Sequence, residues 1–407
     1  MTTFIYIIGN SEINVWGLSG RERLQRMLKA FNNQVTLVDD LSNIPDGAQA
    51  LLLCADHLFD ARVLSALVHT RLNLILDSNS DQTVAIRIAD GNVPNVLADF
   101  LGEGNGQAIS TFPRYKLDDL NLELQQKNLK KKDAPYVLFI NSSNYKILES
   151  ELFAGSYKGV TDLVTKWIWP VPAFWFTHLC VRIGLRPNHV TLISLVFAAL
   201  AGVAFWYGHY GIGLVVGWVM TFLDTVDGKL ARVTVTSSRF GDVLDHSLDI
   251  IHPPLWYMAW GVGLTTVSIS IPGLQILMWL MFIGYIGGRA CEGVFQFWIG
   301  SFDMFIWRKF DSFNRLITAR RNPNLILLTC SWLINQPELG FLSVVIWQLL
   351  STSILAMRVI IGWRVKRHHG PLKSWFEEIT LGRNEGELAV RIFTRTPVNI
   401  NDRRVTN

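Results

Sequence analysis

Six long apolar stretches constrain the fold of this chain more than any other feature. They follow one another at residues 189–207, 211–230, 242–267, 273–299, 324–336 and 339–363. A helix needs about 20 residues to cross the hydrocarbon core of a bilayer. Most of the stretches reach that length, and the fifth reaches it if it begins near Ile317. We therefore predict an all-α bundle of six transmembrane helices over residues 189–367.

The basic residues between these stretches predict an orientation. Three connections, at 208–211, 265–273 and 335–340, contain no Lys or Arg. The other connections and the segment after the sixth stretch hold Lys229, Arg232, Arg239, Arg308, Lys309, Arg315, Arg320, Arg321, Arg364, Lys366 and Arg367. Basic and non-basic connections alternate, as the positive-inside rule expects. We therefore expect both termini and the connection after the second stretch to be cytoplasmic.

The first 150 residues have the composition of a soluble domain. Short apolar strands are predicted at FIYIIG (4–9), QVTLVDD, ALLLCAD and LNLILDS, with helices at GRERLQRMLKAF (20–31) and RVLSALVH. Strands that alternate with helices favour an α/β domain with a mostly parallel sheet. The Lys-rich run KNLKKKD (127–133) follows this domain or interrupts its last elements, and it is most simply a solvated linker.

A segment rich in Trp and Phe separates the two parts. Residues 166–188 read KWIWPVPAFWFTHLCVRIGLRPN and are interrupted by Pro170 and Pro172. A seventh span here would break the alternation of charge described above. We therefore predict an interfacial amphipathic segment over 151–188 that lies along the cytoplasmic surface of the membrane.

The composition agrees with this division. Half of the 407 residues are hydrophobic and 17% are charged, while 15 Trp and 23 Phe favour a bilayer interface. We expect an integral membrane protein of a bacterial-type inner membrane. The net charge of +4 is mild, and no nucleic-acid partner is expected. Residues 368–407 are expected to form a cytoplasmic tail without a chemical role.

A cluster of aspartates follows the second apolar stretch. In DTVDGKLARVTVTSSRFGDVLDHSLD (224–249), Asp224 and Asp227 are three residues apart, and Asp245 and Asp249 are four apart. Side chains at these spacings share one face of a helix. Because a short loop joins the two helices, the two faces can meet at the cytoplasmic end of the bundle.

Four carboxylates at the edge of a membrane repel one another and are costly to desolvate. A hard divalent cation compensates such charge, and Mg²⁺ typically brings phosphate with it. Gly228, Ala231 and Gly241 would let a ligand approach closely, and Arg232 suits phosphate oxygens. The cluster thus indicates a metal-assisted phosphoryl-transfer site. Solvated acids and helix caps, the alternative, would explain Asp242 but not the spacing of the other four.

The aspartate segment resembles the signature of the CDP-alcohol phosphotransferase family, D-x-x-D-G-x-x-A-R, eight residues, then G-x-x-x-D-x-x-x-D. Every fixed position is matched, by Asp224, Asp227, Gly228, Ala231, Arg232, Gly241, Asp245 and Asp249. The likeness covers about residues 160–370, and the family's six-helix bundle agrees with the six stretches. The family transfers a phosphoalcohol from a CDP-linked donor to an acceptor hydroxyl and releases CMP.

The resemblance implies a role for each matched residue. Mg²⁺ or Mn²⁺ would be held by Asp224, Asp227 and Asp245, with Asp249 bordering the metal. Asp249 would also be the catalytic base that removes the acceptor's proton during in-line attack. CDP would contact Asp224, Asp227, Gly228, Ala231, Arg232 and Gly241. The resemblance further implies a homodimer.

Other residues near the motif have two interpretations each. Asn188, in RPNHVT, either reaches the active site or caps the first span. Arg289 and Glu292 lie three residues apart in the fourth stretch, where they either neutralise each other or leave Arg289 to bind a phosphate of donor or acceptor. Three residues of the third stretch either line an acceptor pocket or pack around a proline kink, namely His252, Trp256 and Tyr257.

The first domain carries a second resemblance. GLSGRERLQRMLKAF followed by LLLCADHLFDARVL is similar to a cytidylyltransferase, a domain fused to CDP-alcohol phosphotransferases in some bifunctional inositol-phosphate enzymes. Asp56 would then lie at a metal-binding strand end. The segment GNSEINVWG departs from the pattern, because it lacks the glycine-rich, Arg-containing loop and the Lys that should follow. An inactive, structural or regulatory remnant over 1–150 is therefore favoured over a second enzyme.

The sequence as a whole predicts a transferase of phospholipid biosynthesis. The expected donor is CDP-diacylglycerol, with glycerol phosphate, inositol phosphate or serine as acceptor. The alternatives are a soluble CDP-alcohol with a lipid or polyol-phosphate acceptor, and a bifunctional enzyme whose first domain makes the CDP-alcohol. A scaffold or transporter is a further alternative. A transporter would carry acids near the bilayer midplane or repeated halves, and we find neither pattern.

Overall fold

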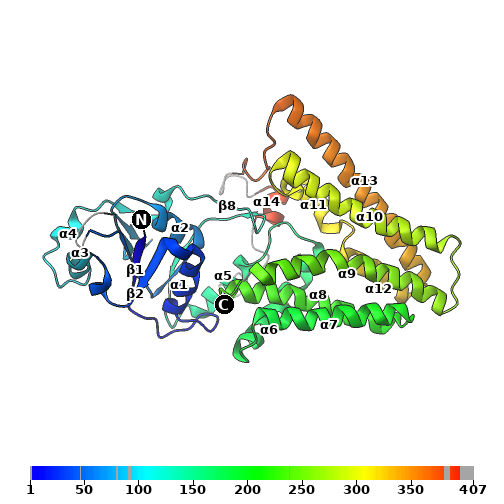
Figure 1. Cartoon of the computed structure of the whole chain (residues 1–407), viewed down its shortest axis with the longest axis horizontal. Helices are drawn as coiled ribbons and strands as arrows, with labels where there is room; N and C mark the ends of the chain where they lie inside the picture. The colour runs from blue at the N-terminus through cyan, green and yellow to red at the C-terminus, as the bar shows by residue number, and fades with distance from the viewer. Residues whose placement is uncertain are drawn as a thin grey trace.

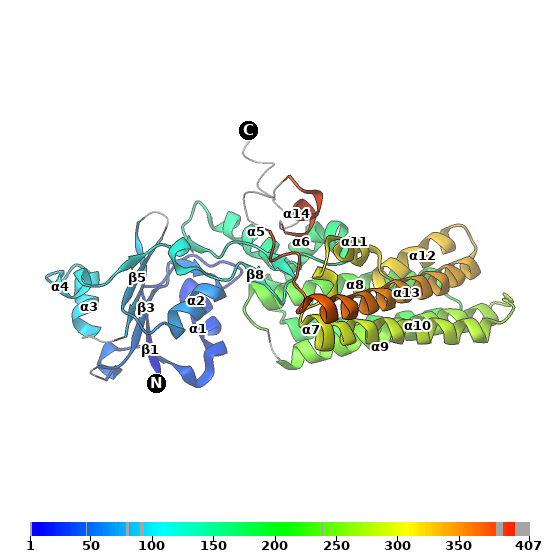
Figure 2. The ribbon, with the colours of Figure 1, turned by 90° about the horizontal axis from the view of Figure 1, so that it is seen from above.

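The structure, a computed structural model, describes residues 2–45, 47–78, 81–89, 93–237, 239–379 and 386–394, without the side chains of residues 41, 239, 240 and 242–246. An α/β domain formed by the N-terminal residues lies at one end of a bundle of long helices (Figure 1). The view from above shows the same arrangement, with the helices running away from the sheet (Figure 2). The division into a sheet domain and a helical part is therefore confirmed.

The sheet of the N-terminal domain is mixed. Its strands follow the order β2-β1-β3-β6-β5-β7. Their bounds are β1 Thr3–Ile8, β2 Val35–Val38, β3 Ala50–Cys54, β5 Leu74–Asp77, β6 Thr83–Ile88 and β7 Arg114–Tyr115. The expected parallel pairing holds for β1 with β2 and β3. Strand β6, however, runs antiparallel to both β3 and β5.

Helices cover both faces of this sheet. Side chains alternate between the two faces of a strand, so neighbours in β3 enter different cores. Leu51 and Leu53 pack with the face that carries α1 (Gly20–Leu28) and α2 (Ala61–His69), whereas Leu52 packs on the other side. That side carries α3 (Val93–Phe100) and α4 (Gln107–Ser110). The domain therefore has three layers.

Helix α1 begins at a well-formed N-terminal cap. The Ser19 hydroxyl accepts a hydrogen bond from the backbone N–H of Glu22, and the Glu22 carboxylate accepts one from the backbone N–H of Ser19. This reciprocal pair satisfies two N–H groups that would otherwise lack partners. The cap fixes the direction of a helix whose arginines contact the transmembrane part.

Shorter elements complete the N-terminal half. Antiparallel pairs join β4 (His57–Phe59) to β10 (Val137–Phe139), and β8 (Gln125–Gln126) to β9 (Lys131–Lys132). Short helical segments lie at η1 Lys29–Gln34, η2 Leu41–Asn43, η3 Leu117–Leu120 and α5 Tyr145–Gly155. The Lys-rich run is not simply a solvated linker, because Lys131 is buried and donates to the carbonyl of Gly155 at 2.7 Å and to Asp133 at 2.6 Å.

A helix occupies each of the six places at which the sequence predicts a span. The bounds are α7 Pro187–Trp206, α8 Tyr210–Val233, α9 Arg239–Thr266, α10 Leu274–Val294, α12 Arg321–Leu333 and α13 Pro337–His369. Within the described residues, four segments are long and apolar enough to cross a membrane: α7, α8, α13, and α10 continued through the π-helical turn η5 (Phe295–Gly300). Helix α12 has only 13 residues. The count of six spans therefore stays a prediction.

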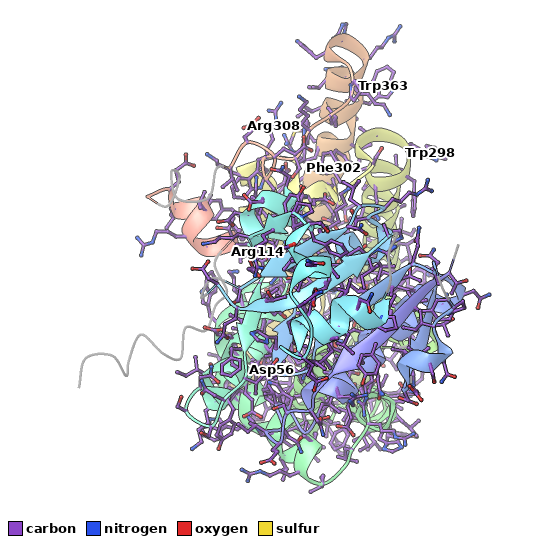
Figure 3. The ribbon with its side chains drawn as sticks, turned by 90° about the vertical axis from the view of Figure 1, so that its left-hand side faces the viewer. Asp56, Arg114, Trp298, Phe302, Arg308 and Trp363 are labelled. Carbon is purple, nitrogen blue, oxygen red and sulfur yellow. The ribbon has the colours of Figure 1, made fainter. Side chains whose placement is uncertain are left out.

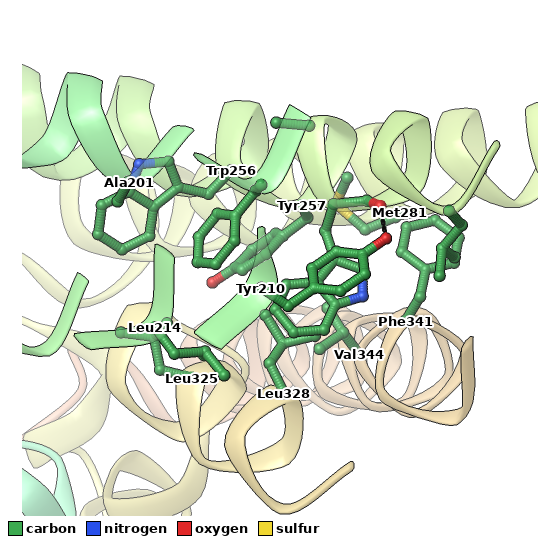
Figure 4. Close-up of a cluster of buried hydrophobic side chains, with 14 of the residues drawn as sticks. Ala201, Tyr210, Leu214, Trp256, Tyr257, Met281, Leu325, Leu328, Phe341 and Val344 are labelled. Carbon is green, nitrogen blue, oxygen red and sulfur yellow. Dashed lines mark hydrogen bonds between the residues drawn. The ribbon is translucent and has the colours of Figure 1, made fainter. Parts of the chain in front are cut away.

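Aromatic side chains fill the centre of the bundle (Figure 4). The indole of Trp256 donates to the carbonyl of Ala198 at 2.7 Å, and the hydroxyl of Tyr210 donates to the carbonyl of Trp260 at 3.1 Å. These bonds satisfy the polar ends of large apolar rings. Helices α7 and α9 approach so closely that a Cβ placed on Gly263 would lie 2.0 Å from the carbonyl oxygen of Phe205.

The outer surface of the long helices is apolar. Large side chains such as Ile283 on α10, Ile346 on α13 and Val203 on α7 are each more than half exposed. Contiguous apolar surface of this kind marks contact with a partner or a membrane. Together with the four candidate spans, it supports an integral membrane protein.

Before the first long helix, α6 (Pro170–Arg182) follows the π-helical turn η4 (Val164–Ile168). Its 13 residues are too few to span a bilayer. Exposed apolar side chains recur every four residues along this segment, at Trp167, Val171, Trp175, Leu179 and Ile183. The stripe favours the predicted position along a membrane surface.

The C-terminal segment returns to the N-terminal half of the chain. Trp375 and Phe376 pack in one cluster with Phe305, near η6 (Met304–Ile306) and α11 (Lys309–Ile317). The ammonium of Lys132 donates to the carbonyls of Phe376 and Ile379, at 2.9 and 2.5 Å. The short helix α14 (Leu388–Phe393) joins the same cluster. Figure 3 labels Trp298 and Trp363 at the periphery of the nearby helix ends.

Candidate functional site

The motif helix α8 carries five of the eight signature positions near its C-terminal end. Asp224 and Asp227 are followed by Gly228, Ala231 and Arg232. Asp227 is only 4% exposed, and the side chain of Asp224 is 13% exposed. Both carboxylates are thus withdrawn from water at the end of the bundle that faces the N-terminal domain, where an unpaired charge would be costly.

Arg321 joins carboxylates from two of the motif's helices. Its Nη2 donates to Oδ2 of Asp224 at 2.5 Å, and its Nη1 donates to Oδ1 of Asp249 at 2.7 Å. Asp224 lies on α8 and Asp249 on α9, so the predicted meeting of the two helical faces is confirmed for this pair. Arg321 itself comes from the N-terminus of α12.

Thr191 holds the third described aspartate. Its hydroxyl donates to Oδ2 of Asp227 at 2.6 Å, from the first turns of α7. This bond connects RPNHVT to the motif through Thr191 rather than through Asn188. Asn188 is exposed and lines a separate cavity of about 460 Å³, together with Arg186 and Arg26.

The glycine and arginine of the motif are in contact. A Cβ placed on Gly228 would lie 3.0 Å from Nη2 of Arg232, so the guanidinium folds back over the position where a side chain is missing. Between them in the sequence, Lys229 is buried. Its ammonium lies 3.3 Å from the carbonyl of Ser156 and 3.6 Å from the centre of the Tyr157 ring.

Two further signature positions lie on α9, and one of them is only partly described. Gly241 lies in α9, and Asp245 lies on the same helix, but the side chain of Asp245 is outside the described residues. Within the residues that the structure does describe, no group of three or more His, Cys, Asp or Glu could hold a metal ion. The complete aspartate set is therefore a prediction from the sequence.

The donor atoms present nevertheless fit a divalent cation. Carboxylate oxygens are the ligands that Mg²⁺ and Mn²⁺ prefer. The positive charge of Arg321 already lies between Asp224 and Asp249, which shows that these two side chains can share one cation. Asp227 lies one helical turn from Asp224 on the same helix.

Arg289 takes part in a three-residue network. Its Nη2 donates to Glu292 at 2.5 Å, and Glu292 also accepts from Arg320. Tyr285, one turn earlier on α10, donates to the backbone carbonyl of Asp249 at 3.1 Å. The mutual neutralisation of Arg289 and Glu292 is confirmed, and the additional arginine leaves this network with a net positive charge beside the motif.

The aromatic residues of α9 belong to the core. Trp256 and Tyr257 are buried in the central cluster, where Figure 4 shows them beside Tyr210 and Leu325. Nδ1 of His252 is bonded to the carbonyl of Leu248 at 2.6 Å. Packing therefore accounts for Trp256 and Tyr257.

The sequence analysis missed Arg321, Thr191 and Tyr285 as neighbours of the motif. The sequence analysis counted Arg321 only among the basic residues of a connection predicted to be cytoplasmic. Its position in the sequence, far from Asp224, gives no sign that the two side chains meet. Thr191 lies in the segment RPNHVT, in which the sequence analysis considered only Asn188. An available signal was that Thr191 and Arg321 stand at the starts of helices on the side that the sequence predicts to be cytoplasmic, where the motif is also predicted to lie.

In the N-terminal domain, Asp56 follows β3, as the sequence predicts. Its carboxylate is 2.7 Å from Nδ1 of His57, and this hydrogen bond lowers the pKa of Asp56. The side chain is about half exposed, and Figure 3 labels it on the N-terminal domain. The metal-binding role of Asp56 stays a prediction from the sequence.

The known proteins that resemble this chain match part of its helical region. Residues 185–310 match the family described as CDP-alcohol phosphatidyltransferase. A phosphatidylinositol phosphate synthase of Mycobacterium marinum is 35% identical over 118 residues, which are 27% of this chain and 49% of that protein. Cholinephosphotransferase 1 of Xenopus laevis is 31% identical over 121 residues, 28% of this chain and 29% of that protein. The chain thus spans about half or less of the length of these relatives.

Among solved structures, the phosphatidylinositol phosphate synthase of Mycobacterium tuberculosis in complex with manganese and citrate has 20% sequence identity and a TM-score of 0.36. The match covers 46% of this chain and 87% of that one. The signature residues from Asp224 to Asp249 all lie within the segment that matches this family. This chain therefore carries, at residues 185–310, a domain of the CDP-alcohol phosphatidyltransferase family.

Proposed function

We propose that the protein is an integral membrane transferase that moves a phosphatidyl group from CDP-diacylglycerol to an acceptor hydroxyl and releases CMP. The observation that carries the proposal is the pairing of Asp224 on α8 and Asp249 on α9 through a single cation, Arg321. It supports a joint charge-binding site for these two signature residues. Relatives named phosphatidylinositol phosphate synthase support the same class of reaction.

In this proposal Asp224, Asp227, Asp245 and Asp249 would hold Mg²⁺ or Mn²⁺, and the bound metal would neutralise the donor's diphosphate. Arg232, folded over Gly228, would bind phosphate oxygens of the donor. Ala231 and Gly241 would leave room for the cytidine diphosphate. Thr191 would keep Asp227 in one orientation through its 2.6 Å hydrogen bond.

Asp249 is proposed as the general base. Its side chain is 44% exposed, against 13% for Asp224, so an acceptor can approach it. The acceptor hydroxyl would give its proton to Asp249 while its oxygen forms a bond to the phosphorus of the phosphatidyl group. The bond from that phosphorus to the oxygen of CMP breaks, and CMP leaves with the electron pair.

The acceptor is proposed to be an alcohol that carries a phosphate, of the inositol phosphate type. The network of Arg289, Glu292 and Arg320 supports this choice because its net charge is positive. Tyr285 connects the same helix to the backbone of Asp249. A phosphate bound by Arg289 would place the acceptor's hydroxyl near the base. Transfer from a soluble CDP-alcohol to a lipid hydroxyl is the alternative, in line with the cholinephosphotransferase relative.

The remaining predictions concern the setting of this site. We propose that both termini and the motif face the cytoplasm, that six helices cross the membrane, and that the protein is a homodimer. We further propose that residues 1–150 are a cytidylyltransferase-like remnant without their own activity. The strand order of the sheet, with parallel β2, β1 and β3 beside an antiparallel β6, supports a nucleotide-binding origin.

The decisive experiment measures CMP release by the full chain in lipid nanodiscs with Mg²⁺. CDP-diacylglycerol is supplied with glycerol phosphate, inositol phosphate or serine, and the lipid product is identified by mass spectrometry. Acceptor-dependent CMP release that is lost in Asp249→Asn would support the proposal. Release only from a soluble CDP-alcohol would support the alternative donor, and no release from either donor would refute a transferase.

A further inference from the structure

A large cavity lies where the N-terminal domain meets the end of the motif helix. Its volume is about 1010 Å³. Ala231 and Arg232 line it from α8, and Arg23, Arg26 and Lys29 line it from the N-terminal domain. The cavity therefore has one wall from the phosphotransferase signature and another from a domain outside the matched family segment.

The charges around this cavity favour an anionic ligand. Five basic residues line it, namely Arg23, Arg26, Lys29, Lys131 and Arg232, against the two acids Asp60 and Asp133. Both acids already have basic partners. Asp60 accepts from Arg62 at 2.7 Å, and Asp133 accepts from Lys131 at 2.6 Å. Lys29 is exposed, and its ammonium makes no hydrogen bond or ion pair within the described residues, so its charge is available to a ligand.

Hydrogen bonds fix the two walls relative to each other. Arg23 donates to the carbonyls of Val15 and Val233, at 3.0 and 2.7 Å, and Arg26 donates to the carbonyl of Thr234 at 2.8 Å. Val233 and Thr234 directly follow Arg232 at the end of α8. Arg23 and Arg26 of α1 thus cap the C-terminal end of α8, whose last carbonyl groups have no N–H partner within the helix.

The cavity also offers surface for a planar ring. Phe59 and Tyr136 line it, with the apolar side chains of Leu58, Leu129 and Leu152. Ligand pockets for small molecules are about 300–1,000 Å³ in volume and combine apolar walls with a few polar groups. A nucleotide has this combination, because it joins a planar base to an anionic phosphate chain.

We infer that the N-terminal domain completes a cytidine-nucleotide pocket at the end of the motif helix, in which Lys29 and Arg26 bind phosphate oxygens beside Arg232. The inference rests on the proposed function for its choice of nucleotide. It assigns to the N-terminal domain a direct part in binding the CDP portion of the donor. Free cytidine nucleotide has the same chemistry, and the two sources are separated by the experiment below.

The experiment uses the full chain in lipid nanodiscs with Mg²⁺. Dissociation constants for CMP and CTP are measured by calorimetry, and the KM for CDP-diacylglycerol is measured from CMP release. The variants are Lys29→Gln, Arg26→Gln and the charge-preserving Lys29→Arg. Lys373→Gln is the matched control, because Lys373 is an exposed lysine that does not line the cavity. Thermal unfolding of each variant verifies that the fold is retained.

Lys29→Gln is expected to raise the dissociation constant of CMP about fivefold, the effect of losing one partly exposed ionic contact. Lys29→Arg and Lys373→Gln are expected to retain wild-type affinity. A parallel rise in the KM for CDP-diacylglycerol, with kcat unchanged, would assign the pocket to the donor. Weaker CTP binding with an unchanged KM would assign it to free nucleotide. Unchanged constants in both Lys29→Gln and Arg26→Gln would overturn the inference.

The same measurements separate this inference from the proposed reaction. Nucleotide binding is repeated in the Asp249→Asn background, where no turnover is expected. Weaker binding on changing Lys29, in a protein that releases no CMP from any donor, would refute the transferase and keep the nucleotide pocket. Normal CMP release with no effect of Lys29 or Arg26 would refute the pocket and keep the transferase.

Discussion

The guanidinium of Arg321 lies 2.5 Å from the carboxylate of Asp224. The same guanidinium lies 2.7 Å from Asp249, so a residue of α12 compensates negative charges that come from α8 and α9. A metal ion that used these carboxylate oxygens would compete with Arg321 for them. Arg321 thus stabilises the motif when no metal is bound.

Replacement of Arg321 should make stability depend more strongly on metal. In EDTA, Arg321→Met is expected to lose roughly 2–3 kcal/mol of stability, because Asp224 and Asp249 lose their cation. Mg²⁺ or Mn²⁺ should restore more stability to this variant than to the wild type. Thermal unfolding with and without metal measures the difference, and Arg364→Met, at an exposed arginine of α13, serves as control. An equal effect of metal on both proteins would contradict the competition.

Loss of the Thr191 hydroxyl should weaken metal binding. Thr191→Val removes the donor of the 2.6 Å bond to Asp227 and leaves this buried carboxylate without it. Loss of a partner that orients a metal ligand typically costs about 10–100-fold in metal affinity or activity. The Mg²⁺ concentration for half-maximal CMP release should therefore rise about tenfold. Thr191→Ser should retain the wild-type value, and a defect of equal size in both variants would point to packing.

Arg23 should stabilise the end of the motif helix from the N-terminal domain. Arg23→Met leaves the buried carbonyl of Val233 without this donor, at a cost of about 1–3 kcal/mol, whereas the carbonyl of Val15 keeps the backbone N–H of Leu18 at 3.3 Å. Hydrogen exchange at the last turn of α8 should accelerate. Arg21→Met is the matched control, because Arg21 donates to Ile7 and Gly9 within its own domain. Acceleration of equal size in both variants would refute the role.

Gly263 should be intolerant of even a methyl group. An Ala at this position would bring its Cβ to within 2.0 Å of the backbone carbonyl of Phe205, so α7 and α9 would have to move apart. We expect a loss of roughly 1–3 kcal/mol, as in other overpacked cores. Gly293→Ala in α10 is the control, since no atom lies within 4 Å of its Cβ. Equal unfolding temperatures for the two variants would show that the helices separate freely.

Lys166 should give the protein a rise in stability at alkaline pH. Burial lowers the pKa of Lys166 to about 8, whereas its ordinary value is 10.5. Between these values the unfolded chain binds more protons than the folded one, so stability increases as the pH rises from about 8 to 10.5. Lys166→Met should remove this increase, and the control Lys373→Met should keep it. Unfolding temperatures from pH 7 to 10 measure it, and an unchanged slope in Lys166→Met would contradict the assignment.

The sequence predicted the long helices well because their determinants are local. Apolar length and the Gly or Pro residues between the stretches placed α7, α8 and α13 within a few residues of their observed bounds. Apolar length also explains why a membrane span at α12 stays a prediction, because its apolar stretch is short. The segment TVAIRI was overlooked, although it follows β5 after a connection of only five residues. So short a connection requires an antiparallel strand, which is why the sheet is mixed.

The sequence predicted only those residues of the candidate site that lie close to one another along the chain. The spacing of Asp224, Asp227 and Asp249 follows from helical periodicity and needs no knowledge of other helices. Arg321 lies 72 residues after Asp249, and Thr191 lies 36 residues before Asp227. Which side chains from distant helices meet the motif depends on the packing of the bundle, and periodicity carries no information about that.

The hydrogen bonds from Lys132 to the carbonyls of Phe376 and Ile379 also set an order of events during synthesis. Lys132 leaves the ribosome more than 240 residues before its partners, when none of the long helices has yet been made. Until then water takes the place of these two carbonyls at the partly buried ammonium of Lys132. These two hydrogen bonds can form only after translation of the segment around Ile379, so a ribosome that stalls before that point would leave the nascent protein without this contact.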